Sequence, residues 1–421
     1  MAILAQAQGL IGLALILLIA WGLSENRRVR PSWRWIGGAV ALQIAIAATL
    51  TLAPGVWQVL SLANHAVSAI ETATLAGSSY MFGFIGGGEA PFVLKPGAAA
   101  PVVLAFQILP LIIVYSALAA LAWHLGVLGV LVRGLSWALQ RTLGVSGVVG
   151  LSGGANIFLG VVEAPLVVRA WFETMSRSEL FATMTLAMST ISGAVLILYA
   201  QTLSKVTPDA VGHMISASLI CLPASILIAR LMVPDDGRTE ARLDETSLRY
   251  DGALDAVVRG AMEGVQLMFA VIGVIIAIFA LVALADMGLA LAPDVAGEAL
   301  TLRRILGWVF APLMWTLGVP LDQAPTAGAL MGTKAILNEY VAYLDMSRLP
   351  AEALDPRAKL IVIYALCGFA NLASIGLLVS TIGTLAPSRR AEVAGLGFKS
   401  WIAGNLASAM TGAVIGLVTL I

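Results

Sequence analysis

Charged residues are scarce in this 421-residue chain. Asp, Glu, Lys and Arg make up 11% of it, against about 25% in soluble domains. Hydrophobic residues reach 59%, and the mean hydropathy is +0.94. So low a charge content with so many apolar residues excludes a soluble monomeric protein.

Net charge is absent as well, because 24 basic residues balance 24 acidic ones. Without a positive field we expect no nucleic-acid partner. The only two cysteines, Cys221 and Cys367, stand in apolar stretches, which excludes a disulfide scaffold. The three histidines lack metal-ligand spacing, and no Walker A, GxSxG or HExxH motif is present. We therefore expect no cofactor and no enzymatic activity.

Long uncharged runs, in contrast, are plentiful. A helix needs about 20 apolar residues to cross the hydrocarbon core of a bilayer. The sequence predicts eight such helices, at 2–23, 36–53, 100–123, 180–200, 210–229, 264–285, 360–384 and 401–420. Two further apolar stretches, 145–165 and 305–340, are interrupted by Gly, Pro and a lone carboxylate, which predicts re-entrant hairpins. For the Gly-, Ser- and Thr-rich segment 55–99 we expect an interfacial helix and a tilted one.

The distribution of basic residues predicts the orientation in the membrane. Cytoplasmic loops carry an excess of Lys and Arg. With both termini outside, sixteen of the 24 basic residues fall on the cytoplasmic side, together with the polar loop from Pro234 to Asp255. This loop separates two halves that each contain one hairpin followed by two helices. The expected fold is an all-α polytopic membrane protein with two oppositely oriented hairpins, an inverted repeat typical of secondary transporters.

Two glutamates stand in otherwise uncharged parts of the hairpins, Glu163 and Glu339. An ionisable side chain at the bilayer centre costs about 2.5–3.5 kcal/mol, so each is expected to face a cavity or a partner. A helix end at the water surface is the alternative for both. The helix after each hairpin has a polar break, at 189–193 and 368–376, where freed carbonyls and side chains such as Asn371 can bind a ligand. Close packing of small residues is the alternative for these breaks.

At these positions the sequence resembles the concentrative nucleoside transporter family over roughly residues 80 to 420. The motifs that carry the resemblance are Asn156-Ile157-Phe158-Leu159-Gly160 with Glu163-Ala164-Pro165, Leu330-Met331-Gly332-Thr333-Lys334 with Asn338-Glu339-Tyr340-Val341-Ala342-Tyr343, and Cys367-Gly368-Phe369-Ala370-Asn371 with Ser374-Ile375-Gly376. The resemblance implies a sodium-coupled symporter that imports nucleosides or a nucleoside-like ribosyl solute by alternating access. It also implies a homotrimer in the bilayer of a bacterial-type inner membrane.

In this family a moving transport domain works against a static scaffold. The resemblance therefore divides the chain into N-terminal scaffold helices with the interfacial segment (1–141), a first transport repeat (142–233), a cytoplasmic loop with one scaffold helix (234–300) and a second transport repeat (301–421). The expected ribose contacts are Glu339, Asn371 and Ser374, with Phe369 beside them.

The nucleobase end of the expected site departs from the family pattern. The first hairpin usually reads Gly-Gln-Thr/Ser-Glu, whereas this chain has Gly160-Val161-Val162-Glu163. The substrate-binding residues expected here are Val161, Val162 and Glu163, together with Val195 of the following helix. Valines neither donate nor accept hydrogen bonds, and an unpaired polar group costs about 1–3 kcal/mol on burial, which favours an unusual nucleoside.

The sodium site implied by the resemblance consists of Asn156, Leu159, Thr190 and Ile191. Such oxygen ligands suit a hard monovalent cation. Family members that use protons lose the asparagine, so its presence favours sodium. A proton-coupled nucleoside transporter, for import or export, remains an alternative. A membrane-embedded enzyme with Glu163 and Glu339 as acid and base is a further one.

Overall fold

The structure is a computed structural model that describes residues 2–419 except 30, 94–101, 161–162, 205, 208, 235–236, 238, 240–247 and 296. Regular structure in these described residues is helical, and the only β pairing among them is an isolated bridge between Val295 and Glu298. The all-α fold predicted from the sequence is confirmed.

The N-terminal part consists of α1 (Ala2–Gly22), α2 (Trp33–Leu52), α3 (Pro54–Phe82), α4 (Leu111–His124) and α5 (Val127–Leu143). Helix α3 is followed by a short 3-10 turn, Gly83–Gly86. The prediction of two helices in 55–99 is therefore wrong for its described residues. The Ser78 hydroxyl lies 2.9 Å from the Gly86 carbonyl and 3.2 Å from the Leu75 carbonyl of its own helix, so it connects the 3-10 turn to α3 and does not break the helix.

The middle of the chain holds α6 (Gly147–Phe158), α7 (Glu163–Val167), α8 (Arg177–Ser189), α9 (Gly193–Leu203), α10 (Ala210–Met232) and α11 (Ala253–Leu289). The C-terminal part holds α12 (Leu302–Thr316), α13 (Ala324–Ile336), α14 (Glu339–Ser347), α15 (Pro356–Leu366), α16 (Leu372–Leu385) and α17 (Arg390–Val418). A capping box begins α8: Glu179 N–H donates to the Ser176 hydroxyl, and the Ser176 N–H donates back to the Glu179 carboxylate.

Six of the eight predicted membrane spans correspond to helical segments long and apolar enough to cross a bilayer. These segments are Trp33–Leu52, Leu104–His124, Arg177–Leu203, Ala210–Met232, Ala253–Leu289 and Pro387–Val418. The predicted span 2–23 is α1, whose Ala7–Gly22 part counts as a shorter apolar helix. The predicted span 360–384 consists of α15 and α16 with a non-helical break between them.

The two predicted hairpins differ in how well their boundaries fit. Stretch 145–165 contains α6 and the start of α7, and Leu159 and Gly160 are the described residues between these two helices. Stretch 305–340 contains two turns, because the chain reverses at Gly318, with φ +108°, and again after α13. The polar Asn338–Glu339 turn therefore lies between α13 and α14, so the hairpin that carries it runs to Ser347.

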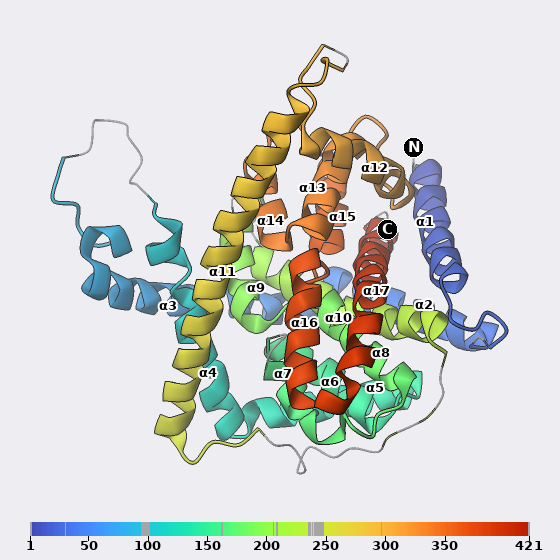
Figure 1. The fold of residues 1–421 in the computed structure, drawn as a ribbon, viewed down its shortest axis with the longest axis horizontal. Helices are drawn as coiled ribbons and strands as arrows, with labels where there is room; N and C mark the ends of the chain where they lie inside the picture. Colours follow the sequence, from blue (N-terminus) through green and yellow to red (C-terminus); the bar gives the residue numbers. More distant parts are fainter. Residues whose placement is uncertain are drawn as a thin grey trace.

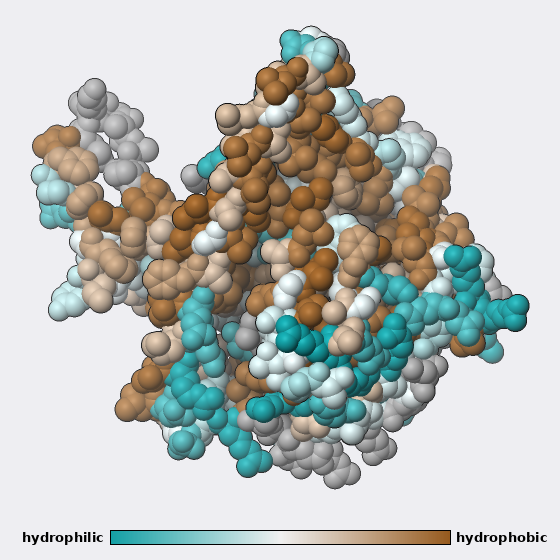
Figure 2. All heavy atoms as spheres, in the orientation of Figure 1, coloured by the Kyte–Doolittle hydropathy of each residue, from teal (hydrophilic) through white to brown (hydrophobic). Residues whose placement is uncertain are grey.

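The most buried helices form the centre of the molecule. Every residue of α8 after Arg177 is buried, and most of α10 and of the second half of α17 is buried too. Figure 1 shows α11 running along one side of this bundle, with both chain termini at the same end and the segment that leads into α11 at the opposite end. Figure 2 shows hydrophobic residues over the upper part of this face and hydrophilic residues gathered on its lower part.

A cluster of ion pairs joins three distant segments at one end of the bundle. Glu25, after α1, contacts Arg177 at 2.8 Å and Lys399 at 3.0 Å. Arg177, at the start of α8, also contacts Glu392 of α17 at 3.2 Å. The hydrogen bond from Arg177 holds the pKa of Glu25 at about 2, well below its ordinary value.

Candidate functional site

Four interruptions of helical structure meet in the interior. They are the turn between α6 and α7, the break between α8 and α9, the turn between α13 and α14, and the break between α15 and α16. A Cβ on Gly368 would lie 2.7 Å from the carbonyl oxygen of Ser189, so the breaks 189–193 and 367–371 are in direct contact. Only a residue without a side chain permits this approach. The two halves of the sequence thus share one site.

Glu339 is the centre of a buried hydrogen-bond network. The Tyr199 hydroxyl donates to Glu339 Oε1 at 2.5 Å, and Asn371 Nδ2 donates to Glu339 Oε2 at 3.0 Å. Glu339 begins α14 and Asn371 caps α16, where its Oδ1 accepts from the Ser374 N–H at 2.9 Å. Glu339 is 3% exposed and Asn371 is 4% exposed. The structure therefore places a fixed carboxylate and a carboxamide side by side at the ends of two helices.

A buried lysine, Lys334, links α13 to α17 next to this hydrogen-bond network. Lys334 is fully buried, and its Nζ donates to Asn405 Oδ1 at 2.9 Å and to Ser408 Oγ at 2.8 Å. Asn405 Nδ2 donates in turn to the carbonyl of Ala370, which the break before α16 has freed. Side chains of α17 thus provide hydrogen-bond partners both for the ammonium group of Lys334 on α13 and for the free carbonyl in the break before α16.

These residues border a cavity of about 590 Å³, within the range of small-molecule sites. Of the substrate-binding residues predicted from the sequence, six line it: Glu163, Val195, Glu339, Phe369, Asn371 and Ser374. Val161 and Val162 lie outside the described residues. The structure thus brings Glu163 of the first half and Glu339 of the second half to one cavity, as the sequence predicts.

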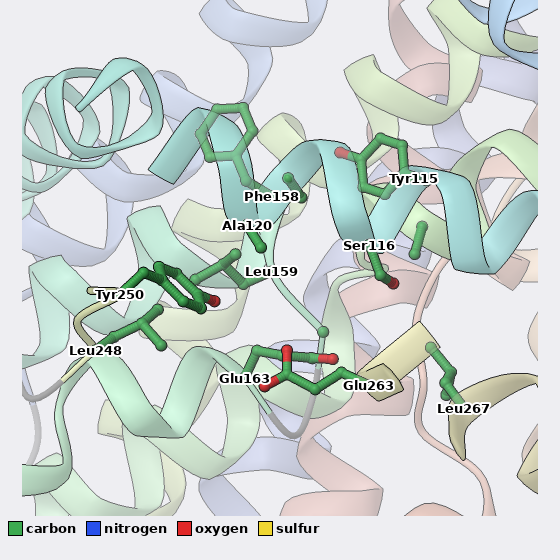
Figure 3. Close-up of a pocket in the computed structure, with 13 residues that line it drawn as sticks. Tyr115, Ser116, Ala120, Phe158, Leu159, Glu163, Leu248, Tyr250, Glu263 and Leu267 are labelled. Carbon is green, nitrogen blue, oxygen red and sulfur yellow. The ribbon is translucent and has the colours of Figure 1, made fainter. Parts of the chain in front are cut away.

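The first hairpin contributes Gly160 and Glu163 to the lining of the same cavity. The carboxylate of Glu163 folds back over Gly160, where a Cβ would lie within van der Waals overlap of it. Figure 3 shows Glu163 and Glu263 with their carboxyl groups facing each other below Tyr250 and Leu159. Glu263 belongs to α11 and lines the cavity together with Gln266 and Leu267.

The predicted cation ligands lie where two helices end. Leu159 caps the C-terminus of α6, and Ile191 lies in the break after α8, so their carbonyls stand outside the helical ladders. The Nδ2 group of Asn156 donates to Ser152 O at 2.8 Å and to Ser152 Oγ at 3.3 Å, and the Thr190 hydroxyl donates to Leu186 O at 2.8 Å. The amide and hydroxyl oxygens therefore keep lone pairs for an ion, and all four residues are buried.

Sequence reasoning missed Tyr199, Asn405 and Glu263, and it gave Lys334 no role. Lys334 and Glu263 carry a signal, because each is an ionisable residue within an apolar helix. Tyr199 and Asn405 carry none, since their partners are remote in sequence: Tyr199 bonds to a residue 140 positions away.

Comparisons with known proteins agree with this geometry. Residues 213–416 match the family described as "Na+ dependent nucleoside transporter C-terminus", residues 11–85 match its N-terminus, and residues 105–206 match "Nucleoside recognition". An "Uncharacterized transporter" of Haemophilus influenzae is 35% identical over 97% of this chain and 96% of that protein. "Nucleoside permease NupC" of Helicobacter pylori is 30% identical over 97% of this chain and 96% of that protein.

A solved structure is similar along its whole length. "CNTnw in an inward-facing substrate-bound state" superposes with a TM-score of 0.89 and 35% identity, and the match covers 100% of this chain and 98% of that one. The family consists of transporters and not of enzymes, so the alternative of a membrane-embedded enzyme is excluded. On its sequence, its fold and its central cavity, this chain belongs to the concentrative nucleoside transporter family.

Proposed function

We propose that this chain is a sodium-coupled symporter that imports nucleosides by alternating access. The observation that carries the proposal is the Glu339–Asn371–Tyr199 network at one end of a cavity of about 590 Å³. A carboxylate and a carboxamide can together accept from and donate to the vicinal hydroxyls of a ribose. Such a fixed polar pair inside an otherwise largely apolar cavity is the usual basis of specificity in small-molecule sites.

In this proposal the nucleoside lies along the cavity. Its ribose contacts Glu339, Asn371 and Ser374, and its base points to Glu163 and Val195. Phe369, beside Asn371 on the cavity wall, supports the apolar face of the ligand.

Sodium as the coupling ion rests on the oxygen atoms of Asn156, Leu159, Thr190 and Ile191. The set contains two side-chain oxygens and two carbonyls, none of them charged, on elements that pack against each other. Neutral oxygen ligands fit a monovalent hard cation, whereas a proton needs a group that titrates. This observation favours sodium over the proton-coupled alternative.

The proposal extends to the assembly and its orientation. Helix α11 is 37 residues long, and 6% of its most apolar window is buried within the single chain, which supports the homotrimer and the contact with lipid that the family resemblance implies. The excess of basic residues on one side supports an inner membrane with both termini outside.

A thermal-shift panel on the purified protein in detergent tests the proposed function. Nucleosides should raise the melting temperature, and should do so more strongly in sodium than in choline, because a ligand that binds only the native state stabilises it by mass action. Free ribose and free nucleobases serve as controls and should give smaller shifts. Equal shifts in sodium and choline would contradict sodium coupling, and no shift with any nucleoside would contradict the substrate class.

A further inference from the structure

Glu263 reaches the cavity from a helix that carries none of the motifs described above. It lies in α11, and its carboxylate faces that of Glu163 across the end of the cavity (Figure 3). The same two residues also line the narrow crevice that continues from this end between Tyr115 and Tyr250. The end of the cavity away from Glu339 is thus bordered by two carboxylates from separate elements.

The nearest basic residue along α11 is directed elsewhere. Arg259, one helical turn before Glu263, donates to the carbonyl of Arg249 at 3.1 Å, approaches Asp255 at 3.5 Å and lies 4.9 Å from the centre of the Tyr250 ring. Among the ion pairs formed by the described residues, none includes Glu263. Glu263 thus forms no direct ion pair among the described residues, and Arg259 acts on it only electrostatically, without a salt bridge.

Two carboxylates that face each other repel when both are ionised. An amino group or a positive charge placed between them relieves this repulsion, because a carboxylate oxygen accepts hydrogen bonds. The neighbours of Glu263 that line the cavity on α11 include Leu267, Val271 and Val274, and apolar walls strengthen the interaction of a charge with a ligand dipole. A base that presents amino groups or a positive charge is attracted to such an end. A base that presents carbonyl oxygens to these carboxylates is repelled, and the Gln266 amide is the neighbouring side chain on the same helix that can donate to it instead.

We propose that Glu263, acting with Glu163, is a specificity-determining residue that selects nucleosides whose base presents amino groups or a positive charge. This inference rests on the proposed transport of nucleosides and on the proposed orientation of the base toward the first hairpin. It names the substrate class that an apolar hairpin with Val161 and Val162 leaves undefined. The chemistry predicts a preference for cytidine over uridine, and for the cationic 1-methyladenosine over adenosine.

Competition binding on the purified protein in sodium tests this proposal. The wild type should bind cytidine about tenfold or more tightly than uridine, the size of one charge-assisted hydrogen bond. Glu263→Gln keeps the shape and removes the charge, so it should reduce that ratio by about tenfold and should also remove the preference for 1-methyladenosine. Asp286→Asn is the matched control, because it removes a carboxylate near the other end of the same helix, outside the cavity, and it should leave both ratios unchanged.

The outcomes separate this inference from the proposed function. Nucleoside binding with equal affinity for cytidine and uridine in the wild type would overturn the role of Glu263 and leave nucleoside transport intact. An unchanged ratio of cytidine to uridine affinity in Glu263→Gln would likewise overturn the role of Glu263 and leave nucleoside transport intact. Absence of any nucleoside binding to the wild type would overturn the proposed function itself, and this inference with it. Glu263→Met, which suits an apolar helix, replaces the Gln variant if the latter does not fold.

Discussion

At the scale of single residues, Glu339 combines burial with two fixed donors. A carboxylate buried this deeply persists only when its oxygens are hydrogen-bonded, and here Tyr199 and Asn371 each donate to one oxygen. Both donors come from elements that are distant in sequence. The Glu339 carboxylate is therefore stabilised by tertiary contacts and not by its own helix. A ribose hydroxyl that enters the cavity adds to this network.

The first prediction concerns this carboxylate. Glu339→Gln should weaken nucleoside binding by about tenfold or more, because the amide loses the charge-assisted bonds to sugar hydroxyls and directs an N–H group at a neighbouring donor. Binding is measured by competition in detergent, with the melting temperature as the test of folding. Glu298→Gln, at the exposed turn before α12, is the control. Unchanged affinity in the Glu339 variant would contradict the ribose assignment.

The second prediction concerns the cation ligands. Thr190→Val removes a hydroxyl oxygen and keeps the shape, so the gain in nucleoside affinity on adding sodium should disappear. Asn156→Ala should have the same effect. Thr202→Val, which removes a helix-facing hydroxyl from α9 by the same chemistry, should keep the sodium response. If both site variants keep it as well, the ion binds elsewhere or is not sodium.

The sequence could predict these residues to different degrees. Glu163, Glu339 and Asn371 stand out because a charge or a carboxamide within an apolar stretch must have a partner or a cavity. The identity of the partners needs the fold, since Tyr199 and Asn405 look like ordinary residues of apolar helices. Glu263 has the same signal as Glu163, yet it stands close to the polar end of a long span, where an acidic residue is unremarkable.

At the scale of elements, the paired breaks of α8/α9 and α15/α16 make the site possible. Each break exposes helix ends to the interior, and the contact of Gly368 with Ser189 fixes one break against the other. Gly404 of α17 packs against both, because a Cβ there would lie 2.7 Å from Met188 and 2.9 Å from Ala370. Site geometry therefore depends on close backbone packing as well as on polar side chains.

The third prediction tests this packing. Gly368→Ala should destabilise the protein by about 1–3 kcal/mol, because the added methyl group overlaps the Ser189 carbonyl and forces the two breaks apart. Gly376→Ala is the matched control, since a Cβ there meets no heavy atom within 4 Å. Thermal denaturation in detergent provides the comparison, and nucleoside affinity should fall together with stability. A Gly368 variant as stable as the control would mean that the breaks are not in contact.

The fourth prediction concerns the ion pairs that join the loop after α1 to α8 and α17. Glu25 has its pKa lowered from 4.5 to about 2 by Arg177, so its contribution to stability is present above pH 4.5 and is lost as the pH falls toward 2. At neutral pH the wild type should be more stable than Glu25→Gln by about 1 kcal/mol or less, because the pair is partly exposed. It should therefore melt at a slightly higher temperature.

The two melting curves of this pair should converge as the solution is acidified below the ordinary carboxyl pKa. Glu352→Gln, in the loop before α15, is the control, because it removes a carboxylate that forms no ion pair among the described residues. A constant difference between the wild type and the Glu25 variant at all pH values would show that the effect is not the charge.

The helices and turns were only partly predictable from the sequence. Runs of apolar residues identified the spanning segments, because the bilayer demands them. Gly and Pro residues mark turns but do not show how many helices they separate, so the sequence predicts a single hairpin in 305–340 where the structure has two turns. The Gly-, Ser- and Thr-rich composition of segment 55–99 predicts two helices, whereas in the structure Thr72, Thr74 and Ser78 bond to carbonyls of their own helix.

At the scale of the whole molecule, the site joins two halves of the chain. The first half supplies Glu163, Val195 and the candidate cation ligands, and the second supplies Glu339, Asn371 and Ser374. In the proposed function, a nucleoside that contacts both halves favours arrangements in which they close around it, and sodium bound at the candidate ion site would influence that closure. Coupling of this kind is a differential affinity for two states, and it acts in both directions.

Transport by reconstituted protein is the most direct test of the central claim, and it is the fifth prediction. Proteoliposomes with an inward sodium gradient should accumulate a labelled nucleoside above its external concentration, by up to about tenfold for a tenfold gradient and one ion per nucleoside. Accumulation should vanish when choline replaces sodium and should persist when a proton ionophore removes any proton gradient. Uptake that continues without sodium, or that the ionophore abolishes, would contradict a sodium-driven symporter.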